Sequence, residues 1–214
     1  MGKLVLSLLA LAAAAWPAYP GFGVFGGTSI PAGQMGSPAG FDMGASALLG
    51  GCFRVATSDL GDVEIAAAYH PRHRPKGFTP SAAMTESKMT ITPITIGTNG
   101  TFALAGAFGF RLGVGAGFYI MKWLEKGTAE VDGQTYPFER TLEIDRAGFY
   151  LCLGPVLQLQ GFAFEVTGRF HYVIDEDEYD YAYKVGGPPL PVKYNKDYHD
   201  MFTDVVVGVN YYFL

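Results

Sequence analysis

One stretch of the chain, residues 102–123, alternates large and small side chains over most of its length. Its even positions are mostly large and apolar, whereas its odd positions from 103 to 117 hold alanine, glycine and a single arginine, Arg111. Because successive side chains of a β-strand point to opposite faces, this alternation predicts a strand. A membrane-spanning helix is the rival interpretation, but a helix would not sort residues by size at every second position, and the five glycines of the stretch would weaken it. Asn99 and Gly100, just before the stretch, predict a tight hairpin turn.

The large side chains of this stretch are expected to face lipid. If they pointed into a barrel, the outer surface would consist almost wholly of alanine and glycine. If they point outward, the apolar side chains meet lipid and the small ones fit the narrow interior of a small barrel. We therefore interpret the stretch as one strand of a transmembrane β-barrel.

Other segments show the same kind of alternation, separated by turn-forming residues. In chain order, the predicted strands span residues 22–30, 43–57, 63–70, 89–98, 102–123, 143–159, 162–174 and 203–213. In the fourth strand the alternation is weakest, and Pro93 predicts a β-bulge that shifts its phase.

The connections between the predicted strands differ in length. Those after the second, fourth and sixth strands have about four or five residues, while the others run from about ten to more than twenty, as in outer-membrane barrels. An even number of strands places both chain ends on one side. The sequence thus predicts an all-β fold, an eight-stranded antiparallel up-and-down transmembrane β-barrel with short periplasmic turns and long external loops.

The composition agrees with a membrane-embedded domain. The chain has 214 residues, of which 49% are hydrophobic and only 16% charged, and it contains 29 glycines. The net charge of -5 gives no reason to expect a nucleic-acid partner.

Residues 1–18 have the pattern of a secretory signal peptide. Lys3 provides the positive charge, residues 4–12 an apolar core, and the alanines that follow a small-residue cleavage site. Cleavage is expected near Ala15 or Ala18. Residues 19–214 are then expected to form the barrel, in an outer membrane.

The last predicted strand resembles a known family feature. Gly208, Tyr211 and Phe213 stand in the spacing G-x-x-Y-x-F, which is similar to the C-terminal assembly signal of outer-membrane barrels. Residues 91–102 and 106–119 also look like the fourth and fifth strands of the small OmpA/OmpX/OmpW-like barrels. This resemblance covers the whole mature chain and implies insertion by the barrel-assembly machinery. We expect a monomer. Members of the OmpA family often carry a C-terminal domain that binds peptidoglycan, and because no such domain follows the last strand here, a cell-wall anchor is not expected.

Several ionisable side chains are predicted to point into the barrel. By the same alternation they are Arg54, Glu64, Arg111, Arg146, Glu165, Arg169, His171 and Asp204. Because an unpaired buried charge is very unfavourable, these groups are expected to pair. We predict a salt-bridge network that closes the lumen, since small barrels are generally filled by their own side chains. The alternative is a narrow gated pore for small solutes or hydrophobic molecules.

Cys52 and Cys152 are both predicted to point inward, from opposite sides of the barrel. Opposite strands are farther apart than the Cα separation of about 4.4–6.8 Å that a disulfide requires, so two free, buried thiols are expected. Neither a metal site nor a cofactor is expected. No serine lies near His171 in the sequence, so an enzyme is not expected, and a lipid-modifying outer-membrane enzyme is the minor alternative.

Two charged segments fall outside the predicted strands. Arg72, His73, Arg74 and Lys76 form a basic cluster at the expected external rim. They either contact lipopolysaccharide phosphates or keep the base of a loop solvated. Residues 175–200 are acidic and rich in tyrosine, a composition that can bind an extracellular ligand. The sequence favours a membrane-structural or surface-interaction role within outer-membrane lipid.

Overall fold

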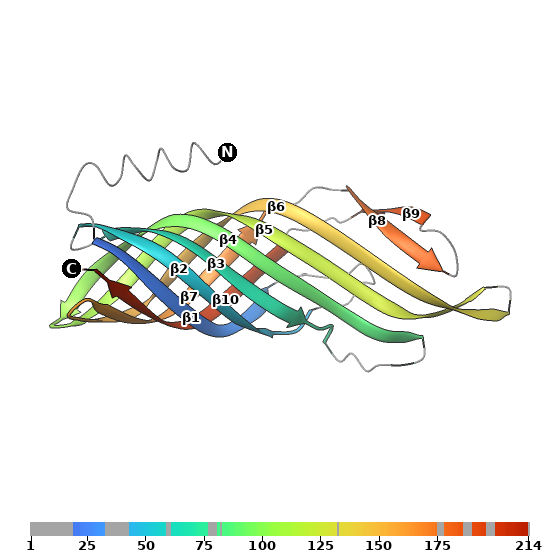
Figure 1. Ribbon diagram of the computed structural model, residues 1–214, viewed down its shortest axis with the longest axis horizontal. Coiled ribbons are helices and arrows are strands. Elements are labelled where there is room, and N and C mark those ends of the chain that lie inside the picture. Colours follow the sequence, from blue (N-terminus) through green and yellow to red (C-terminus); the bar gives the residue numbers. More distant parts are fainter. Residues whose placement is uncertain are drawn as a thin grey trace.

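Antiparallel strands make up most of the described chain and close into a ring (Figure 1). The computed structural model describes residues 19–32, 43–58, 61–76, 81, 83–131, 133–174, 178–185, 190–195 and 200–213. The predicted signal peptide, residues 1–18, lies outside the described residues together with its cleavage site. No helix in the described part of the chain is long and apolar enough to cross a membrane.

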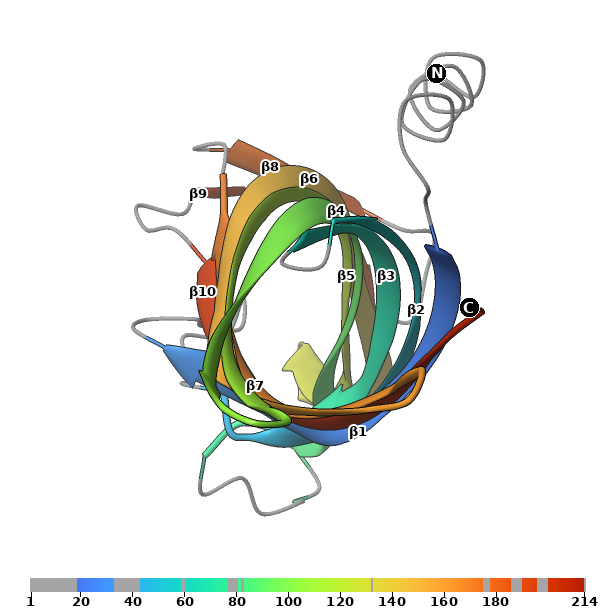
Figure 2. The ribbon, with the colours of Figure 1, turned by 90° about the vertical axis from the view of Figure 1, so that its left-hand side faces the viewer.

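Eight of the ten strands build the barrel. The strands are β1 (Tyr19–Ala32), β2 (Ser46–Ser58), β3 (Gly61–His73), β4 (Met84–Ala105), β5 (Phe108–Val131), β6 (Gln134–Leu159), β7 (Phe162–Val173), β8 (Glu178–Val185), β9 (Leu190–Asn195) and β10 (Asp200–Tyr212). Each of β1 to β6 pairs with the next strand, and β10 pairs with both β7 and β1 to close the ring (Figure 2). All these pairings are antiparallel, so the predicted eight-stranded barrel is confirmed.

The two ends of the barrel differ, because β5 and β6 extend well beyond the other barrel strands at one end only (Figure 1). At the short-turn end, where β1 begins and β10 ends, only residues 59–60, 106–107 and 160–161 separate consecutive strands. At the opposite, long-hairpin end, β5 and β6 extend as a tall hairpin with only residues 132–133 between them. The β8–β9 hairpin pairs with this part of β6. The prediction of a long loop after the fifth strand is therefore wrong, because the chain continues there as paired strands.

The turn between β4 and β5 contains Gly106. The turn predicted at Asn99 and Gly100 is therefore wrong. The latter two residues pair within the β4–β5 ladder. Gly106 has a positive φ of 56°, which glycine adopts without strain in a tight turn. Phe102 pairs with Phe110, and both face outward. Large residues thus occupy even-numbered positions both before and after the turn. The alternation in the sequence therefore does not reveal the turn.

A belt of apolar side chains covers the outside of the barrel toward the short-turn end. Its exposed members include Phe22, Val24, Leu49, Ile94, Ile96, Phe102, Leu104, Phe110, Leu112, Val114, Phe118, Phe149, Leu151, Leu153, Phe164, Val166 and Val207. Beyond this apolar belt the outward positions become charged, with Lys122 on β5 and Glu143 and Asp145 on β6. A continuous apolar surface of this kind is typical of the lipid-facing band of a membrane barrel.

At the level where the outer surface becomes charged, the inner face of the barrel becomes apolar. Tyr119, Met121 and Trp123 of β5 point inward and are at most 2% exposed, next to the outward-facing Lys122. Where water replaces lipid outside the wall, an apolar interior holds the strands together by the hydrophobic effect, as in a soluble protein.

This change of surroundings also explains the weak alternation of β4. Pro93 pairs with Tyr119 in an unbroken register, and the register shifts of this ladder lie near its two ends. The bulge predicted at Pro93 is therefore wrong. Thr92 faces outward just as Ile94 does, but it lies near the edge of the apolar belt, where the neighbouring medium changes from lipid to water.

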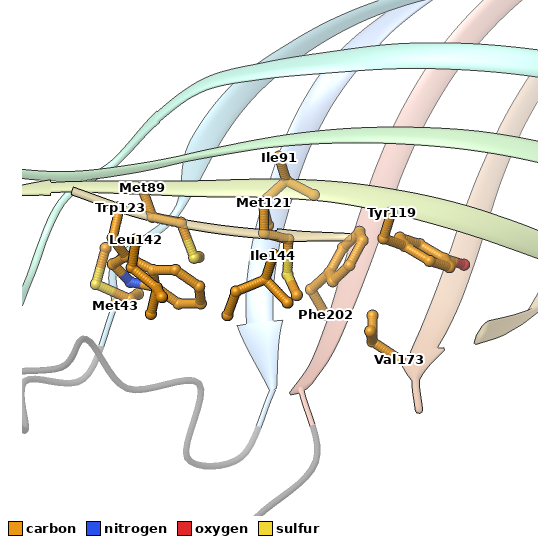
Figure 3. Close-up of a cluster of buried hydrophobic side chains, with 10 residues drawn as sticks. All are labelled: Met43, Met89, Ile91, Tyr119, Met121, Trp123, Leu142, Ile144, Val173 and Phe202. Carbon is orange, nitrogen blue, oxygen red and sulfur yellow. The ribbon is translucent and has the colours of Figure 1, made fainter. Parts of the chain in front are cut away.

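A cluster of buried apolar side chains lies inside the barrel in its long-hairpin half (Figure 3). This apolar cluster consists of Met43, Met89, Ile91, Tyr119, Met121, Trp123, Leu142, Ile144, Val173 and Phe202. Strand register builds it in rows, since Ile91, Met121 and Ile144 are aligned on β4, β5 and β6. Met43, which precedes β2 and bridges to Pro75, packs beside the next row at 1% exposure.

Candidate functional site

Six charged side chains form a continuous series of ion pairs across the lumen, nearer the short-turn end. Opposite charges alternate in the order Asp62, Arg111, Glu165, Arg54, Glu64 and Arg169. Every member of this ionic chain is at most 5% exposed. Because arginines and carboxylates are equal in number, the ionic chain as a whole carries no net charge, which limits the penalty for burying it.

Arg54 is the centre of the ionic chain. Its Nη1 and Nη2 donate to the two carboxylate oxygens of Glu165 at 3.0 and 2.8 Å. Its Nε donates to Glu64 at 2.6 Å. Arg54 and Glu64 are direct partners on β2 and β3, whereas Glu165 approaches from β7. The planar fork of the guanidinium suits this two-point contact with a carboxylate.

The two ends of the ionic chain have partners of their own. Asp62 accepts hydrogen bonds from Arg111 and, at 2.8 Å, from the Nδ2 of Asn99. At the other end, the guanidinium of Arg169 lies 4.5 Å from the centre of the Phe25 ring, a cation–π contact. These contacts hold the ionic chain against opposite walls of the barrel.

A second polar group lies between the ionic chain and the apolar cluster. The Nε2 atoms of His70 and His171 both lie 3.3 Å from Oδ2 of Asp204. The hydroxyl of Tyr119 is 3.0 Å from Nδ1 of His171. The ring of Phe202 stacks on His171 with a centroid separation of 4.4 Å. Phe202 and Tyr119 therefore connect this group to the apolar cluster, of which both are members.

The predicted interior residues separate into distinct positions. Arg54, Glu64, Arg111, Glu165 and Arg169 lie in the ionic chain, while His171 and Asp204 lie in the second polar group. Arg146 is partly exposed, is aligned with Tyr119 across the β5–β6 ladder, and donates from Nη1 to the carbonyl of Asp145 at 2.9 Å.

Two interior residues were missed by the sequence argument. Asp62 and His70 lie toward the two ends of β3. The sequence places Asp62 in the turn before the predicted strand, and His70 is the last residue of that strand, where the external loop is expected to begin. Both are an even number of residues from Glu64, which is the signal that could have found them. The predicted strand, residues 63–70, is shorter than the observed strand, Gly61–His73, so it leaves out Asp62 and ends at His70.

Both cysteines are free and buried, as predicted. The thiol of Cys52 donates to Oδ1 of Asn210, and that of Cys152 to Oδ1 of Asn99, each at 3.2 Å. A glycine on the intervening strand permits each contact, since a Cβ on Gly23 would lie 1.8 Å from Oδ1 of Asn210. Within the described residues, no three His, Cys, Asp or Glu side chains gather in a group that could hold a metal ion.

Solved structures of outer-membrane proteins resemble this barrel over nearly its whole length. A major outer membrane protein from Thermus thermophilus matches with a TM-score of 0.61 at 9% identity, over 91% of this chain and 99% of its own. Neisserial surface protein A matches with a TM-score of 0.52 at 9% identity, over 92% and 99%. The outer membrane protein AlkL matches with a TM-score of 0.51 at 12% identity, over 94% and 92%. No protein-family model and no curated protein sequence matches this chain.

The chain has the fold of the small outer-membrane β-barrels. The likeness at this level of identity is one of fold, and it supports a location in the outer membrane. In such barrels the short turns face the periplasm and the longer connections face outward. By this rule we call the short-turn end of the barrel its periplasmic end and the long-hairpin end its external end.

Only part of the predicted basic cluster is accessible at the external rim. Arg72, Arg74 and Lys76 are exposed. His73 is fully buried, and its Nδ1 lies 2.9 Å from the carbonyl oxygen of Gly44. The ring of His73 is therefore not available to lipid headgroups, which corrects the prediction for this residue.

Cations from two further strands extend the basic cluster beyond the apolar belt. Lys88 of β4 donates to Glu86 at 2.6 Å, and this hydrogen bond lowers the pKa of the Glu86 carboxyl. The charges of Lys126 and Arg72 act on the same carboxylate, so the three cations lie near one another. We define the external basic surface as Arg72, Arg74, Lys76, Lys88, Lys122 and Lys126.

The residues of the predicted assembly signal lie at the end of the last barrel strand. Tyr211 and Phe213 are exposed at the periplasmic end, and Gly208 faces inward. Tyr211 packs against Phe162 at 4.9 Å between ring centres, and Phe213 against Phe22 at 6.0 Å. Such an aromatic girdle is typical of the membrane–water interface. Recognition by the assembly machinery stays a prediction.

The acidic, tyrosine-rich segment 175–200 contains β8 and β9. The positions of its side chains lie outside what the structure describes. Contact of this segment with an extracellular ligand stays a prediction.

Proposed function

We propose that this protein is a closed outer-membrane barrel with a membrane-structural or surface-interaction role. The proposal rests on how little space remains between the ionic chain and the apolar cluster. That gap, bordered by Arg169, His171 and Asp204 among others, has a volume of about 10 Å³. This is room for about one water molecule. A hydrated solute could pass only by displacing side chains of both the ionic chain and the apolar cluster.

Single-channel recording tests the closed lumen. The refolded mature protein is expected to show no regular conductance steps in a planar bilayer. Arg111→Ala removes the cation between Asp62 and Glu165 and is expected to admit water and give a measurable leak. Lys122→Ala, which breaks only an exposed pair with Glu143, is the control and should stay silent. Regular steps from the unmodified protein would overturn the proposal.

The external basic surface supports a contact with lipopolysaccharide. It lies just outside the apolar belt, at the level where lipid headgroups begin. The phosphate groups of lipopolysaccharide are anionic, and the guanidinium fork of Arg72 or Arg74 matches their geometry. The proposed role at the membrane surface includes this contact.

The double variant Arg72→Gln/Arg74→Gln is expected to bind lipopolysaccharide vesicles more weakly. Each cation near an anionic membrane surface contributes about 1 kcal/mol, so the pair should change the apparent affinity by about twentyfold or more at low salt. The matched comparison is lipid A without its phosphates, on which the variant and the unmodified protein should behave alike. Equal affinity of both proteins for phosphorylated vesicles would argue against the contact.

Passage of small apolar compounds is a second candidate function. The apolar cluster favours it, because Met43, Met89 and Met121 are flexible side chains that can rearrange around an apolar molecule. Proteoliposomes that take up an apolar fluorophore faster than protein-free vesicles would support this function. Uptake at the protein-free rate would reject it.

A further inference from the structure

A cavity opens at the periplasmic end of the barrel, on the far side of the ionic chain from the apolar cluster. Its volume is about 250 Å³, far larger than the gap of about 10 Å³ on the other side of the ionic chain. Tyr19, Thr101, Gln158 and Tyr212 line it, with Gln160 at its rim. We call this cavity the periplasmic vestibule. Figure 2 views the barrel from this end.

The vestibule is open because two of the residues at this level of the wall are small. Ala56 of β2 and Ala163 of β7 line it without filling it. Asp62 lies at its floor, and the carboxylate of Asp62 is paired with Arg111 beneath it. The hydroxyl of Tyr212 lies 3.4 Å from Oδ2 of Asp62 and 3.5 Å from Nη2 of Arg111, which connects the wall to this floor.

The lining combines hydrogen-bonding groups with apolar residues, Leu159 and Phe162 among them, and so points to a neutral ligand with both polar and apolar faces. The carboxylate of Asp62 is the one acidic group among the lining residues, and Arg111 already balances its charge. The amides of Gln158 and Gln160 and the hydroxyl of Thr101 can each donate and accept hydrogen bonds. An ion of either sign would meet no free countercharge here, whereas a hydroxyl-rich molecule would find partners.

Gln160 provides an independent observation. Its φ is 36° and that of Gly161 is 87°, so both residues of this two-residue turn have positive φ. Turns of this kind strongly favour Asn-Gly or Gly-Gly, and a glutamine in the first position is strained. Backbone strain that persists in a protein is often linked to a functional side chain. Gln160 is one of the residues that line the vestibule.

We propose that the periplasmic vestibule binds one ring of a neutral sugar. The ring hydroxyls exchange hydrogen bonds with Gln158, Gln160 and Thr101, while a C–H face of the ring packs against Tyr19 or Tyr212. The vestibule is smaller than the range of about 300–1,000 Å³ that is typical of pockets for drug-sized ligands, so it accepts a single ring. Such a ring can belong to a free sugar or to the end of an acetylated glycan.

Saturation-transfer NMR of the refolded protein in lipid nanodiscs tests the proposal with two probes, trehalose and chitobiose. The unmodified protein is expected to bind at least one of them with a Kd of about 1 mM, typical of a small site with a few hydrogen bonds. Binding of trehalose alone identifies a free sugar as the ligand type, and binding of chitobiose alone identifies an acetylated glycan. No binding of either probe at about ten times that concentration overturns the proposal.

Two variants separate binding from folding. Ala56→Leu fills the vestibule and is expected to weaken sugar binding more than about tenfold. Gln160→Asn suits the turn better but shortens the amide side chain, so binding should fall about fivefold while the urea midpoint of unfolding stays equal or rises. The matched control is Gln134→Asn at the external end, which should leave binding unchanged. Binding by Ala56→Leu equal to that of the unmodified protein contradicts the proposed site.

Discussion

Replacing Arg54 by methionine is expected to lower the free energy of unfolding by about 3–5 kcal/mol. Arg54 donates to both Glu64 and Glu165, and all three side chains are at most 2% exposed. Methionine roughly preserves the volume but removes the charge, so the ionic chain is left with one excess negative charge away from bulk water. Urea unfolding in lipid vesicles, followed by the mobility difference between folded and unfolded barrel on gels, measures the loss.

A second substitution shows whether charge is the cause. In Arg54→Met/Glu165→Gln the remaining pairs, Asp62 with Arg111 and Glu64 with Arg169, are again balanced, and much of the lost stability should return. Lys122→Met removes an exposed cation paired with Glu143 and should change stability by no more than about 0.5 kcal/mol. A neutral effect of Arg54→Met, or no recovery in the double variant, would show that the ionic chain is not held by charge balance.

Phe202→Ala is expected to lower the free energy of unfolding by about 3–5 kcal/mol through the cavity it leaves. The side chain is fully buried and belongs to the apolar cluster. It stacks on His171 and makes edge contacts with His70 and Tyr119, at centroid separations of 5.5 and 5.9 Å. Its loss therefore loosens both the apolar cluster and the second polar group. The same unfolding measurement applies, with conductance recorded in parallel.

Phe149→Ala is the matched control for Phe202→Ala. Phe149 has the same side chain but faces lipid in the apolar belt, where it is 54% exposed. Acyl chains can occupy the space that the ring leaves, so no cavity forms and the loss should be clearly smaller. If both variants lower the free energy of unfolding by the same amount, the packing of Phe202 inside the lumen stabilises the barrel no more than the contact of Phe149 with lipid does.

The errors of the sequence argument have a common physical origin. Alternation records which face a residue points to, but not which medium that face meets. At Thr92 the outer medium changes from lipid to water, and the change was taken for a bulge at Pro93. At Gly106 the hairpin joins residues of equal parity, so the pattern carried no mark of the turn. Asp62 falls outside the predicted strand 63–70 and His70 is its last residue, because the limits of β3 depend on pairing with its neighbours.

The wall of the barrel follows from local pattern. Strand existence, the outward belt, the inward direction of Arg54, Glu165 and Asp204, and the shortness of the turns at one end all depend on side-chain direction and turn chemistry within a few residues. These properties do not require knowledge of distant partners, so the amino-acid order was sufficient for them.

The contents of the barrel follow from its closure. Arg54 and Glu165 are 111 positions apart, and His70 meets Asp204 from another strand. Such contacts depend on the register of every intervening strand pair, and a slip of one residue would turn each side chain to the opposite face. The ionic chain, the apolar cluster and the periplasmic vestibule thus arise when β10 pairs with β1, because closing the ring sets which inward residues share a level of the lumen.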